Sequence, residues 1–303
     1  MKKVLLLGGD GFLGKNIQDE LKANNVKYTV CSKDCADSNS INCDLLESDD
    51  LTKTFEGFTD IVYLVTLGAA KESMENPLEY QNKELKIMYK VIEACKNNGI
   101  KKIVFASSGG TVYGNCSDEF INESHITVPI SYYGLTKLTL ERILLLQNSL
   151  YGMENVILRI SNPFGDYQRR NSSVGVIPIF TQKILNNEEI VIYGDGSNIR
   201  DYIDCGNVAK AFLLALNYNV NSNYLPVFNI SSKTPLSIND IISIIEDELD
   251  KKAIVTHVSQ RGFDVNRVCL DNTYSIEQLG NYYSGDVVND IKNYVRKNKY
   301  KGR

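Results

Sequence analysis

Val4-Leu-Leu-Leu-Gly8-Gly-Asp-Gly11-Phe-Leu-Gly14, near the start of the chain, decides the fold. A short apolar run, typical of a buried strand, ends at a glycine-rich turn, and an amphipathic stretch over residues 14–24 follows. Glycines in such a turn permit positive φ, close approach of a diphosphate and tight packing of helix on strand. The free N–H groups of the helix then bind the diphosphate. The predicted dinucleotide site comprises Gly8, Gly11, Phe12, Leu13 and Gly14.

The same alternation of apolar runs and amphipathic stretches continues to about residue 160. Further strands are predicted over 28–31, 61–64, 103–106 and 156–159, and long helices over 80–97 and 132–150. Continuous apolar strands separated by helices indicate a parallel sheet covered on both faces. We therefore predict an α/β fold with a doubly wound, Rossmann-type sheet over residues 1–165. Residues 166–303 are less regular and indicate a smaller mixed α/β substrate lobe, with some segments returning to the first domain.

Composition excludes several classes of protein. With 43% apolar and 23% charged residues in 303, the chain is typical of a globular protein, and its net charge of −4 gives no basic field for nucleic acid. The first apolar run is too short for a signal peptide, and the next longest is about half a membrane span. We expect a cytoplasmic protein with no membrane partner. Seven irregularly spaced cysteines indicate reduced thiols, and we expect no metal site.

The end of the second strand bears on the choice between NAD and NADP. A carboxylate there binds the ribose 2′-hydroxyl, whereas neutral or basic groups accommodate a 2′-phosphate. If the strand ends at Cys31, Ser32 and Lys33 face the ribose and favour NADP; if the loop shifts, Asp34 favours NAD. The type of dinucleotide stays open. Asp44 and Leu45 are predicted to contact the adenine, with helix capping as the alternative for Asp44.

A tyrosine and a lysine four residues apart supply the predicted chemistry. Tyr133 and Lys137 open the long helix, so both lie on one helix face, downstream of the segment Ser107-Ser-Gly-Gly-Thr-Val-Tyr-Gly114. A cation near the phenol favours the phenolate, which makes Tyr133 a base usable near neutral pH. The pair is also expected to contact the nicotinamide ribose.

Taken together, the motifs resemble those of the extended short-chain dehydrogenases, specifically the nucleotide-sugar epimerase and dehydratase family that includes UDP-galactose 4-epimerase. The resemblance covers nearly the whole chain. It rests on GGDGFLG, ESMENPLEY (72–80), SSGGTVYG (107–114), YGLTK (133–137), RISNPFG (159–165), GDGSNIRDYID (194–204) and RGFDV (261–265).

This resemblance implies roles in the second lobe and two departures from the family pattern. Arg200 and Arg261 would bind the substrate diphosphate, Asp264 the nucleoside ribose, and Asn162 the phosphates. Gly109 stands where the family has a serine that assists the tyrosine. Ser108 and Thr111 are the candidate replacements, and Thr111 is favoured because a strand would project it on the same face as Gly109. Glu84 stands where the family has an asparagine.

The resemblance also implies a homodimer, formed by the helices at 80–97 and 132–150. Their outward faces are expected to offer Ile87, Val91, Leu138 and Leu145, unless these residues cover the sheet.

The expected activity is hydride transfer at C4 of a nucleotide sugar by an NAD(P)-dependent enzyme. A 4-epimerase of a UDP-sugar or related nucleotide sugar, serving polysaccharide or glycan precursor synthesis, is the leading interpretation. The alternative is an NADP-dependent 4-keto-sugar-nucleotide reductase, which Ser32, Lys33 and Gly109 favour. A 4,6-dehydratase fits less well, because such relatives carry an Asp-Glu pair where this chain has Gly110-Thr111. A non-catalytic dinucleotide-binding protein would be expected to have lost Tyr133 or Lys137.

Overall fold

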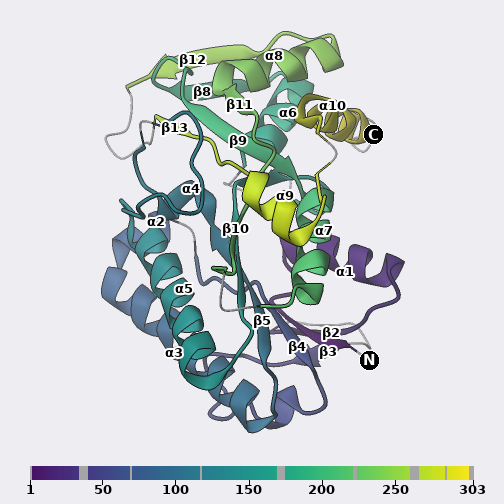
Figure 1. The fold of residues 1–303 in the computed structure, drawn as a ribbon. Coiled ribbons are helices and arrows are strands. Elements are labelled where there is room, and N and C mark those ends of the chain that lie inside the picture. Colours follow the sequence, from purple (N-terminus) through teal and green to yellow (C-terminus); the bar gives the residue numbers. More distant parts are fainter. Residues whose placement is uncertain are drawn as a thin grey trace.

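The computed structural model describes residues 2–33, 40–68, 70–116, 118–168, 175–220, 224–259, 266–283 and 285–299. These residues form a large lobe built around a parallel sheet, and a smaller lobe that sits at the top of the view in Figure 1.

The large lobe contains a seven-stranded sheet in the order β10-β6-β5-β4-β1-β2-β3. Every neighbouring pair is parallel. Because parallel strands need crossover connections, this sheet carries helices on both faces. The strands are β1 (Lys3–Leu7), β2 (Lys27–Ser32), β3 (Ser40–Asn42), β4 (Asp60–Tyr63), β5 (Lys102–Ser108), β6 (Val156–Ile160) and β10 (Val227–Ile230).

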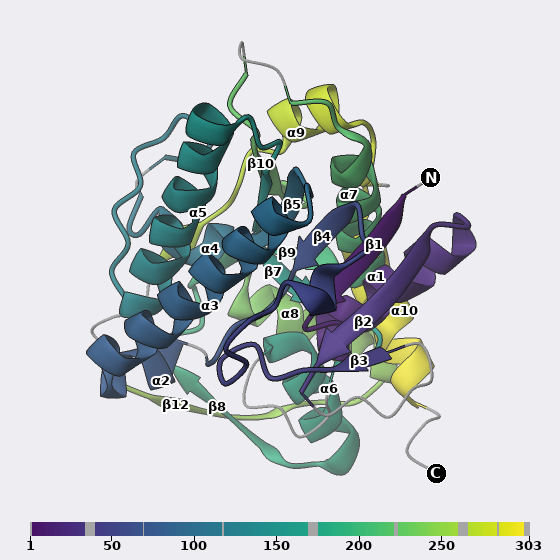
Figure 2. The same ribbon diagram turned by 90° about the horizontal axis from the view of Figure 1, so that it is seen from below.

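Two separate apolar cores cover the two faces of this sheet. On one face, α3 (Pro77–Asn97) and α5 (Tyr132–Tyr151) bury Ile87, Val91 and Leu140 against the strands. On the other face, α1 (Phe12–Ala23), α7 (Cys205–Asn217) and α9 (Thr273–Leu279) pack around Phe212 and Tyr282. Figure 2 shows α3 and α5 on the side of the sheet opposite to α1 and α7.

Three short helical elements lie in the connections of the large lobe. They are η1 (Lys53–Phe55), α2 (Ala70–Glu75) and α4 (Gly109–Val112).

The smaller lobe has its own core, in which Phe164, Ile190 and Ile241 are buried. β9 is its centre: β11 and β13 flank it, β7 also pairs with it, and β12 pairs separately with β8. The strands are β7 (Asn162–Phe164), β8 (Glu189–Tyr193), β9 (Ile199–Asp204), β11 (Pro235–Ser237), β12 (Ile254–Val258) and β13 (Arg267–Val268). The helices are α6 (Val176–Asn186), α8 (Ile238–Leu249) and α10 (Val287–Lys299).

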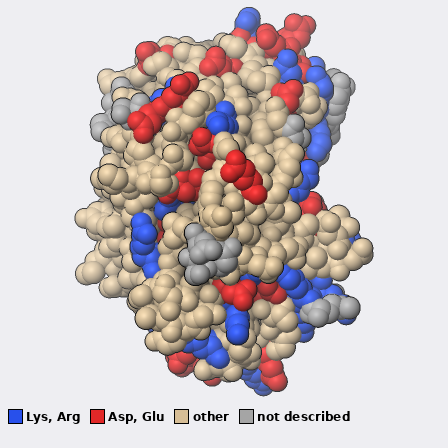
Figure 3. All heavy atoms as spheres, in the orientation of Figure 1, with Lys and Arg blue, Asp and Glu red and all other residues tan. Residues whose placement is uncertain are grey.

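The fold predicted from the sequence is confirmed as a doubly wound α/β architecture with a mixed second lobe. The chain crosses between the lobes more than once: α7 packs beside α1, and β10 is the edge strand of the large sheet, although both follow residue 165. Within the described residues, no helix is long and apolar enough to cross a lipid bilayer. On the face seen in Figure 3, acidic and basic side chains are interspersed, with no single basic field.

Candidate active site

The glycine-rich turn between β1 and α1 has the geometry that its sequence predicts. Gly8 adopts a φ of 76°, which favours glycine. A Cβ added to Gly14 would lie 2.2 Å from the carbonyl oxygen of Gly9, so α1 packs on the turn too closely for any side chain there. The turn therefore leaves the N-terminus of α1 open to a ligand.

A cavity of about 450 Å³ opens beside this turn at the carboxyl ends of the strands. In doubly wound sheets this edge is where ligands bind. All the cofactor residues predicted from the second strand and the glycine turn line it: Gly8, Gly11, Phe12, Leu13, Gly14, Ser32, Lys33, Asp44 and Leu45. The structure thus brings these nine residues to one cavity of a size suited to part of a dinucleotide.

Two charged residues close the far end of this cavity. β2 ends at Ser32, and the Lys33 ammonium lies 3.0 Å from the Asp44 carboxylate. The other oxygen of Asp44 accepts the N–H groups of Leu46 and Glu47. Asp44 therefore caps the turn that follows it, as the alternative interpretation proposed, while it still lines the cavity. Asp34 lies outside the described residues.

The start of α5 is fixed by a cap and by close packing. The Oγ of Ser131 accepts the N–H of Gly134 at 3.2 Å. A Cβ on Gly134 would lie 2.6 Å from the carbonyl oxygen of Thr111, so α5 rests directly on α4. This packing sets where the first turn of α5 places its side chains.

Tyr133 and Lys137 lie one turn apart on α5. The N–H of Tyr133 donates to the Oγ of Ser73 at 3.0 Å. The Nζ of Lys137 donates to the carbonyl of Ala106 at 3.2 Å and lies 5.8 Å from the centre of the Tyr133 ring. Both side chains point toward the end of β5, where the predicted chemistry would take place.

The ionisation of this pair differs from the expectation based on sequence. Burial, followed by the negative charge of Glu84, raises the pKa of Tyr133 to about 12, and a hydrogen bond from Ser108 opposes the shift. Burial also lowers the pKa of Lys137, which Glu84 and Glu141 raise in turn. Desolvation disfavours the charged form of each group, so burial raises the pKa of the phenol and lowers that of the ammonium.

The hydroxyl beside Tyr133 is that of Ser108. Residues 109–112 form a helical turn, so the expectation that Thr111 projects like a strand residue is wrong. The Oγ1 of Thr111 instead points back to the carbonyl of Ser108, at 3.4 Å. A Cβ on Gly109 would lie 2.3 Å from a methyl group of Leu270, so the space that a serine would need is filled by that side chain.

A buried ion pair supports the floor of the site. Arg159 donates to both carboxylate oxygens of Glu141, at 2.7 to 3.2 Å, and also to the hydroxyl of Tyr113 at 2.9 Å. Ser107 donates to the same carboxylate. These hydrogen bonds link β5, β6 and α5, which is the satisfied arrangement that a buried ion pair requires.

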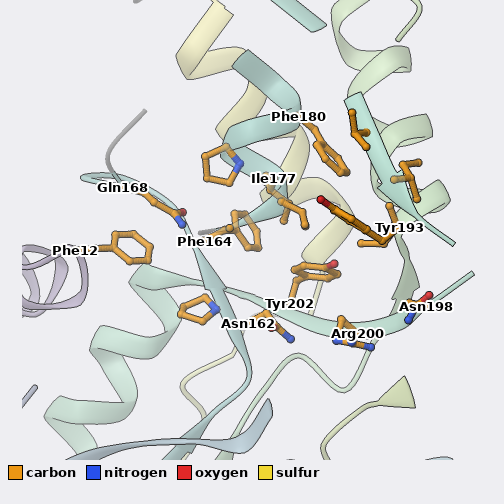
Figure 4. A pocket seen from close by; sticks show the side chains of 17 residues that line it. Phe12, Asn162, Phe164, Gln168, Ile177, Phe180, Tyr193, Asn198, Arg200 and Tyr202 are labelled. Atoms are coloured by element: carbon orange, nitrogen blue, oxygen red, sulfur yellow. The ribbon is translucent and has the colours of Figure 1, made fainter. Parts of the chain in front are cut away.

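A second cavity of about 450 Å³ lies in the smaller lobe (Figure 4). Arg200 and Asn162, two of the predicted substrate residues, line it. The amide of Asn162 donates to the carbonyl of Asp201 at 2.8 Å, and a guanidinium nitrogen of Arg200 donates to the carbonyl of Ile199 at the same distance. Arg261 and Asp264 lie outside the described residues.

The two cavities share Phe12, the first residue of α1. Figure 4 shows its ring entering the second cavity from α1, across from the residues of the smaller lobe. The cavity beside the glycine turn and the cavity in the smaller lobe therefore adjoin at Phe12.

Several residues of the second cavity escaped the sequence analysis. Tyr193 and Tyr202 stand across from Arg200, and Gln168 lies near Phe12 (Figure 4). Tyr193 continues the alternation of exposed and buried residues in β8. This alternation predicts a strand, but it does not show that the outer face of the strand lines a cavity. The wall also contains Phe164, Ile177, Phe180 and Asn198.

Three potential metal ligands meet in the loop after α4, although their spacing did not suggest it. The Nε2 of His125 lies 3.1 Å from the Sγ of Cys116 and 3.3 Å from a carboxylate oxygen of Asp118. All three ligand atoms lie within 4.8 Å of one another.

The outward faces of α3 and α5 carry other residues than those expected. Ile87 and Val91 are buried against the sheet, and Leu138 and Leu145 are partly buried. The exposed large apolar residues of the two helices are Leu78, Tyr89, Tyr132, Leu135, Leu146, Leu150 and Tyr151.

Comparison with known proteins gives relatives over nearly the whole chain. A Methanocaldococcus jannaschii protein, whose name gives UDP-glucose 4-epimerase as a provisional assignment, is 34% identical over 301 residues, or 96% of this chain and 97% of that protein. The dTDP-4-dehydro-6-deoxyglucose reductase of Escherichia coli is 32% identical over 297 residues, or 91% of each chain.

The fold is shared with solved structures as well. The UDP-glucose 4-epimerase of Thermotoga maritima, crystallised with UDP-glucose, superposes with a TM-score of 0.92 at 26% identity, over 99% of this chain and all of that one. Residues 4–231 match the family described as NAD dependent epimerase/dehydratase. The glycine turn, the Tyr133 and Lys137 pair and these similarities agree, and the chain belongs to the NAD dependent epimerase/dehydratase family.

Proposed function

We propose that this enzyme is a 4-epimerase of a UDP-linked sugar that works with a tightly bound NAD. The observation that supports the proposal is that two cavities adjoin at Phe12. One cavity is lined by the glycine turn and the other by Arg200 and Asn162. The large lobe would hold the dinucleotide, and the smaller lobe the nucleotide part of the substrate.

The residues around the glycine turn fit a dinucleotide. The glycine at position 14 leaves no room for a side chain, and the N–H groups at the start of α1 face the cavity where a diphosphate would lie. Gly11, Phe12 and Leu13 would hold the diphosphate, and Asp44 and Leu45 the adenine. When bound, the nicotinamide accepts a hydride from the sugar and returns it.

The arrangement at the end of β2 favours NAD over NADP. Lys33 lines the cavity at the end of β2, and its ammonium lies 3.0 Å from the Asp44 carboxylate. A 2′-phosphate would have to compete with this carboxylate for the ammonium group. Ser32 would meet the ribose hydroxyls instead.

The chain's own residues would move one proton. As a phenolate, Tyr133 would take the proton of the sugar C4 hydroxyl; as a phenol, it would return it to the C4 oxygen. Ser108 would hydrogen bond to the same oxygen or to the phenol. Lys137 would hold the ribose of the nicotinamide and stabilise the phenolate.

The family resemblance and the second cavity together indicate which residues of the smaller lobe would bind the substrate. Arg200 would bind the diphosphate through its planar guanidinium group, and Asn162 would contact the phosphates. Arg261 and Asp264 would complete the diphosphate and ribose contacts. Tyr193 and Tyr202 offer aromatic rings to the base.

We also propose that the enzyme is a homodimer whose subunits meet through α3 and α5. Exposed apolar side chains on a helix surface mark an association site. Leu78, Tyr89, Leu135, Leu146 and Leu150 give these two helices such a surface.

The content of the cofactor cavity in the purified enzyme tests the proposal. The protein is denatured, and the released dinucleotide is identified by mass spectrometry. An epimerase returns its hydride in every cycle, so close to one NAD per chain is expected. An empty enzyme that binds NADPH would overturn the epimerase assignment.

A 4-keto-sugar-nucleotide reductase is the second candidate. Reduction of a ketone needs a proton donor, and the Tyr133 hydroxyl would serve as that donor. The reductase from Escherichia coli also matches this chain over 91% of its length. Consumption of NADPH in proportion to a 4-keto substrate would assign this function.

A further inference from the structure

The segment between α4 and α5 brings a cysteine, an aspartate and a histidine together. The Nε2 of His125 lies 3.1 Å from the Sγ of Cys116 and 3.3 Å from a carboxylate oxygen of Asp118. Thiolate, imidazole and carboxylate are the groups that bind zinc in proteins. Their order over residues 116–125 matches no common zinc spacing, so the sequence led to the expectation of no metal site.

A backbone contact determines which nitrogen of His125 faces this cluster. The Nδ1 of His125 lies 2.8 Å from the carbonyl oxygen of Ile126. Because a carbonyl oxygen only accepts hydrogen bonds, Nδ1 carries the hydrogen, and Nε2 presents its lone pair to Cys116 and Asp118. Metal-binding histidines are oriented in the same way, by a hydrogen bond from the nitrogen that does not bind the ion.

The three atoms that face one another all carry lone pairs. With a neutral imidazole, neither the Nε2 of His125 nor the carboxylate oxygen of Asp118 can donate to the other, although they lie 3.3 Å apart. The single thiol hydrogen of Cys116 can satisfy one of these two acceptors. A cation bound between the three atoms satisfies all of them at once.

Charge and distance fit a divalent ion. The N–H of Asp118 donates to the Sγ of Cys116 at 3.4 Å, and such a hydrogen bond favours the thiolate. Thiolate and carboxylate together balance the charge of Zn²⁺. Zinc bonds of about 2.0–2.3 Å at tetrahedral angles separate the ligand atoms by about 3.4–3.6 Å, so small side-chain movements suffice. The Asp118 side chain is 58% exposed, so an ion can reach the cluster from solvent.

We propose that Cys116, Asp118 and His125 bind a zinc ion, with water in the fourth position. As the Zn–S bond forms, the thiol proton passes to solvent, and no electron is transferred. The ion closes the loop of residues 116–125 beside Tyr113, whose ring lies edge-on to the His125 ring at 6.1 Å between centres. The three ligands line neither the cavity at the glycine turn nor that of the smaller lobe, so the ion holds this loop and takes no part in hydride transfer.

Binding of cobalt(II) to the chelator-treated protein tests the site. Cobalt replaces zinc in tetrahedral sites, and cobalt bound to a thiolate absorbs in the near ultraviolet as well as in the visible range. We expect these bands to saturate at one cobalt per chain. Zinc then removes them, because a tetrahedral site that contains sulfur prefers zinc. A protein without these bands, whose Kd for zinc is weaker than about 100 μM, would overturn the proposal.

Single-ligand variants locate the ion. Loss of an outer-shell partner weakens metal binding by about 10–100-fold, so His125→Gln, which removes a ligand, is expected to weaken zinc binding by more than about a hundredfold. Cys116→Ser is expected to remove the near-ultraviolet band of cobalt. The matched control is His257→Gln, which removes the chain's other histidine, whose Nδ1 also lies 2.8 Å from a carbonyl oxygen, that of Gly194. Equal zinc affinity of His125→Gln and His257→Gln would contradict the assignment.

Thermal unfolding gives a second measurement that the wild type alone can decide. A ligand that binds the folded chain stabilises it, so free zinc at about a hundred times its Kd is expected to raise the melting temperature by about 4 °C in a chain of this size. His257→Gln should show the same rise, and His125→Gln should show none. A wild-type melting temperature that zinc leaves unchanged would refute binding at a folded site.

Discussion

Burial governs the acid–base behaviour of single side chains in this enzyme. The Lys137 side chain is buried and that of Tyr133 is partly buried, and desolvation shifts the pKa of each so that the neutral form is favoured. The motif itself was readable from the sequence. The sequence could not reveal this shift, because it depends on how the folded chain surrounds the two side chains.

Removing the Tyr133 hydroxyl tests its role as acid and base. Tyr133→Phe is expected to lower kcat by about a hundredfold or more, the usual contribution of a positioned proton donor. Binding of UDP, measured by calorimetry, should change little because the ring remains. Tyr132→Phe, which alters an exposed neighbour, should keep wild-type turnover. Full activity of Tyr133→Phe would contradict the assignment.

The buried Asp201 makes stability depend on pH. Its carboxylate accepts the N–H groups of Ser232 and Leu270, yet burial raises its pKa to about 6. The folded state thus binds the proton more tightly than the unfolded state. The tighter proton binding of Asp201 stabilises the fold at low pH. This contribution is lost as the pH rises from the usual aspartate pKa to about 6, at about 1.4 kcal/mol per pH unit between these two values.

Melting temperatures of wild type and Asp201→Asn at pH 5 and pH 7.5 check this effect. The melting temperature of the wild type minus that of Asp201→Asn should be larger at pH 5 than at pH 7.5. A difference that stays constant between the two pH values would show that Asp201 does not titrate in this range.

At the scale of helices and strands, the sequence predicted the elements that a local pattern of apolar residues determines. The strands of the large sheet read as apolar runs, and α1, α3 and α5 as amphipathic stretches. The return of β10 to the sheet and the packing of α7 beside α1 depend on contacts between distant segments, which periodicity does not report. For the same reason, Ile87 and Val91 face the sheet rather than a partner.

The junction of β1 and α1 predicts a strong effect of one added methyl group. Gly14→Ala places a Cβ against the backbone of Gly9 and should destabilise the fold by about 1–3 kcal/mol, as overpacking does. At Gly11 a Cβ would meet only one atom, at 3.3 Å, so Gly11→Ala should melt near the wild-type temperature. The melting temperatures of both variants are measured without added dinucleotide. Equal melting temperatures would disprove the packing argument.

For the whole molecule, the exposed apolar residues of α3 and α5 predict a dimer in solution. Leu146→Arg puts a charge on this surface and is expected to give monomers by light scattering. Leu225→Arg, which changes a residue of similar exposure away from both helices, should remain dimeric. A monomeric wild type would refute the predicted interface.

The proposed reaction requires that a hydride leaves C4 of the sugar and returns to C4 in the same active site. The most direct measurement supplies a UDP-sugar carrying deuterium at C4, without any added dinucleotide, and follows the product by mass spectrometry and NMR. We predict the C4 epimer with its deuterium retained at C4, because the label would be held by the bound nicotinamide between removal and return. Absence of the epimer, with product formed only from a 4-keto sugar and added NADPH, would contradict the account.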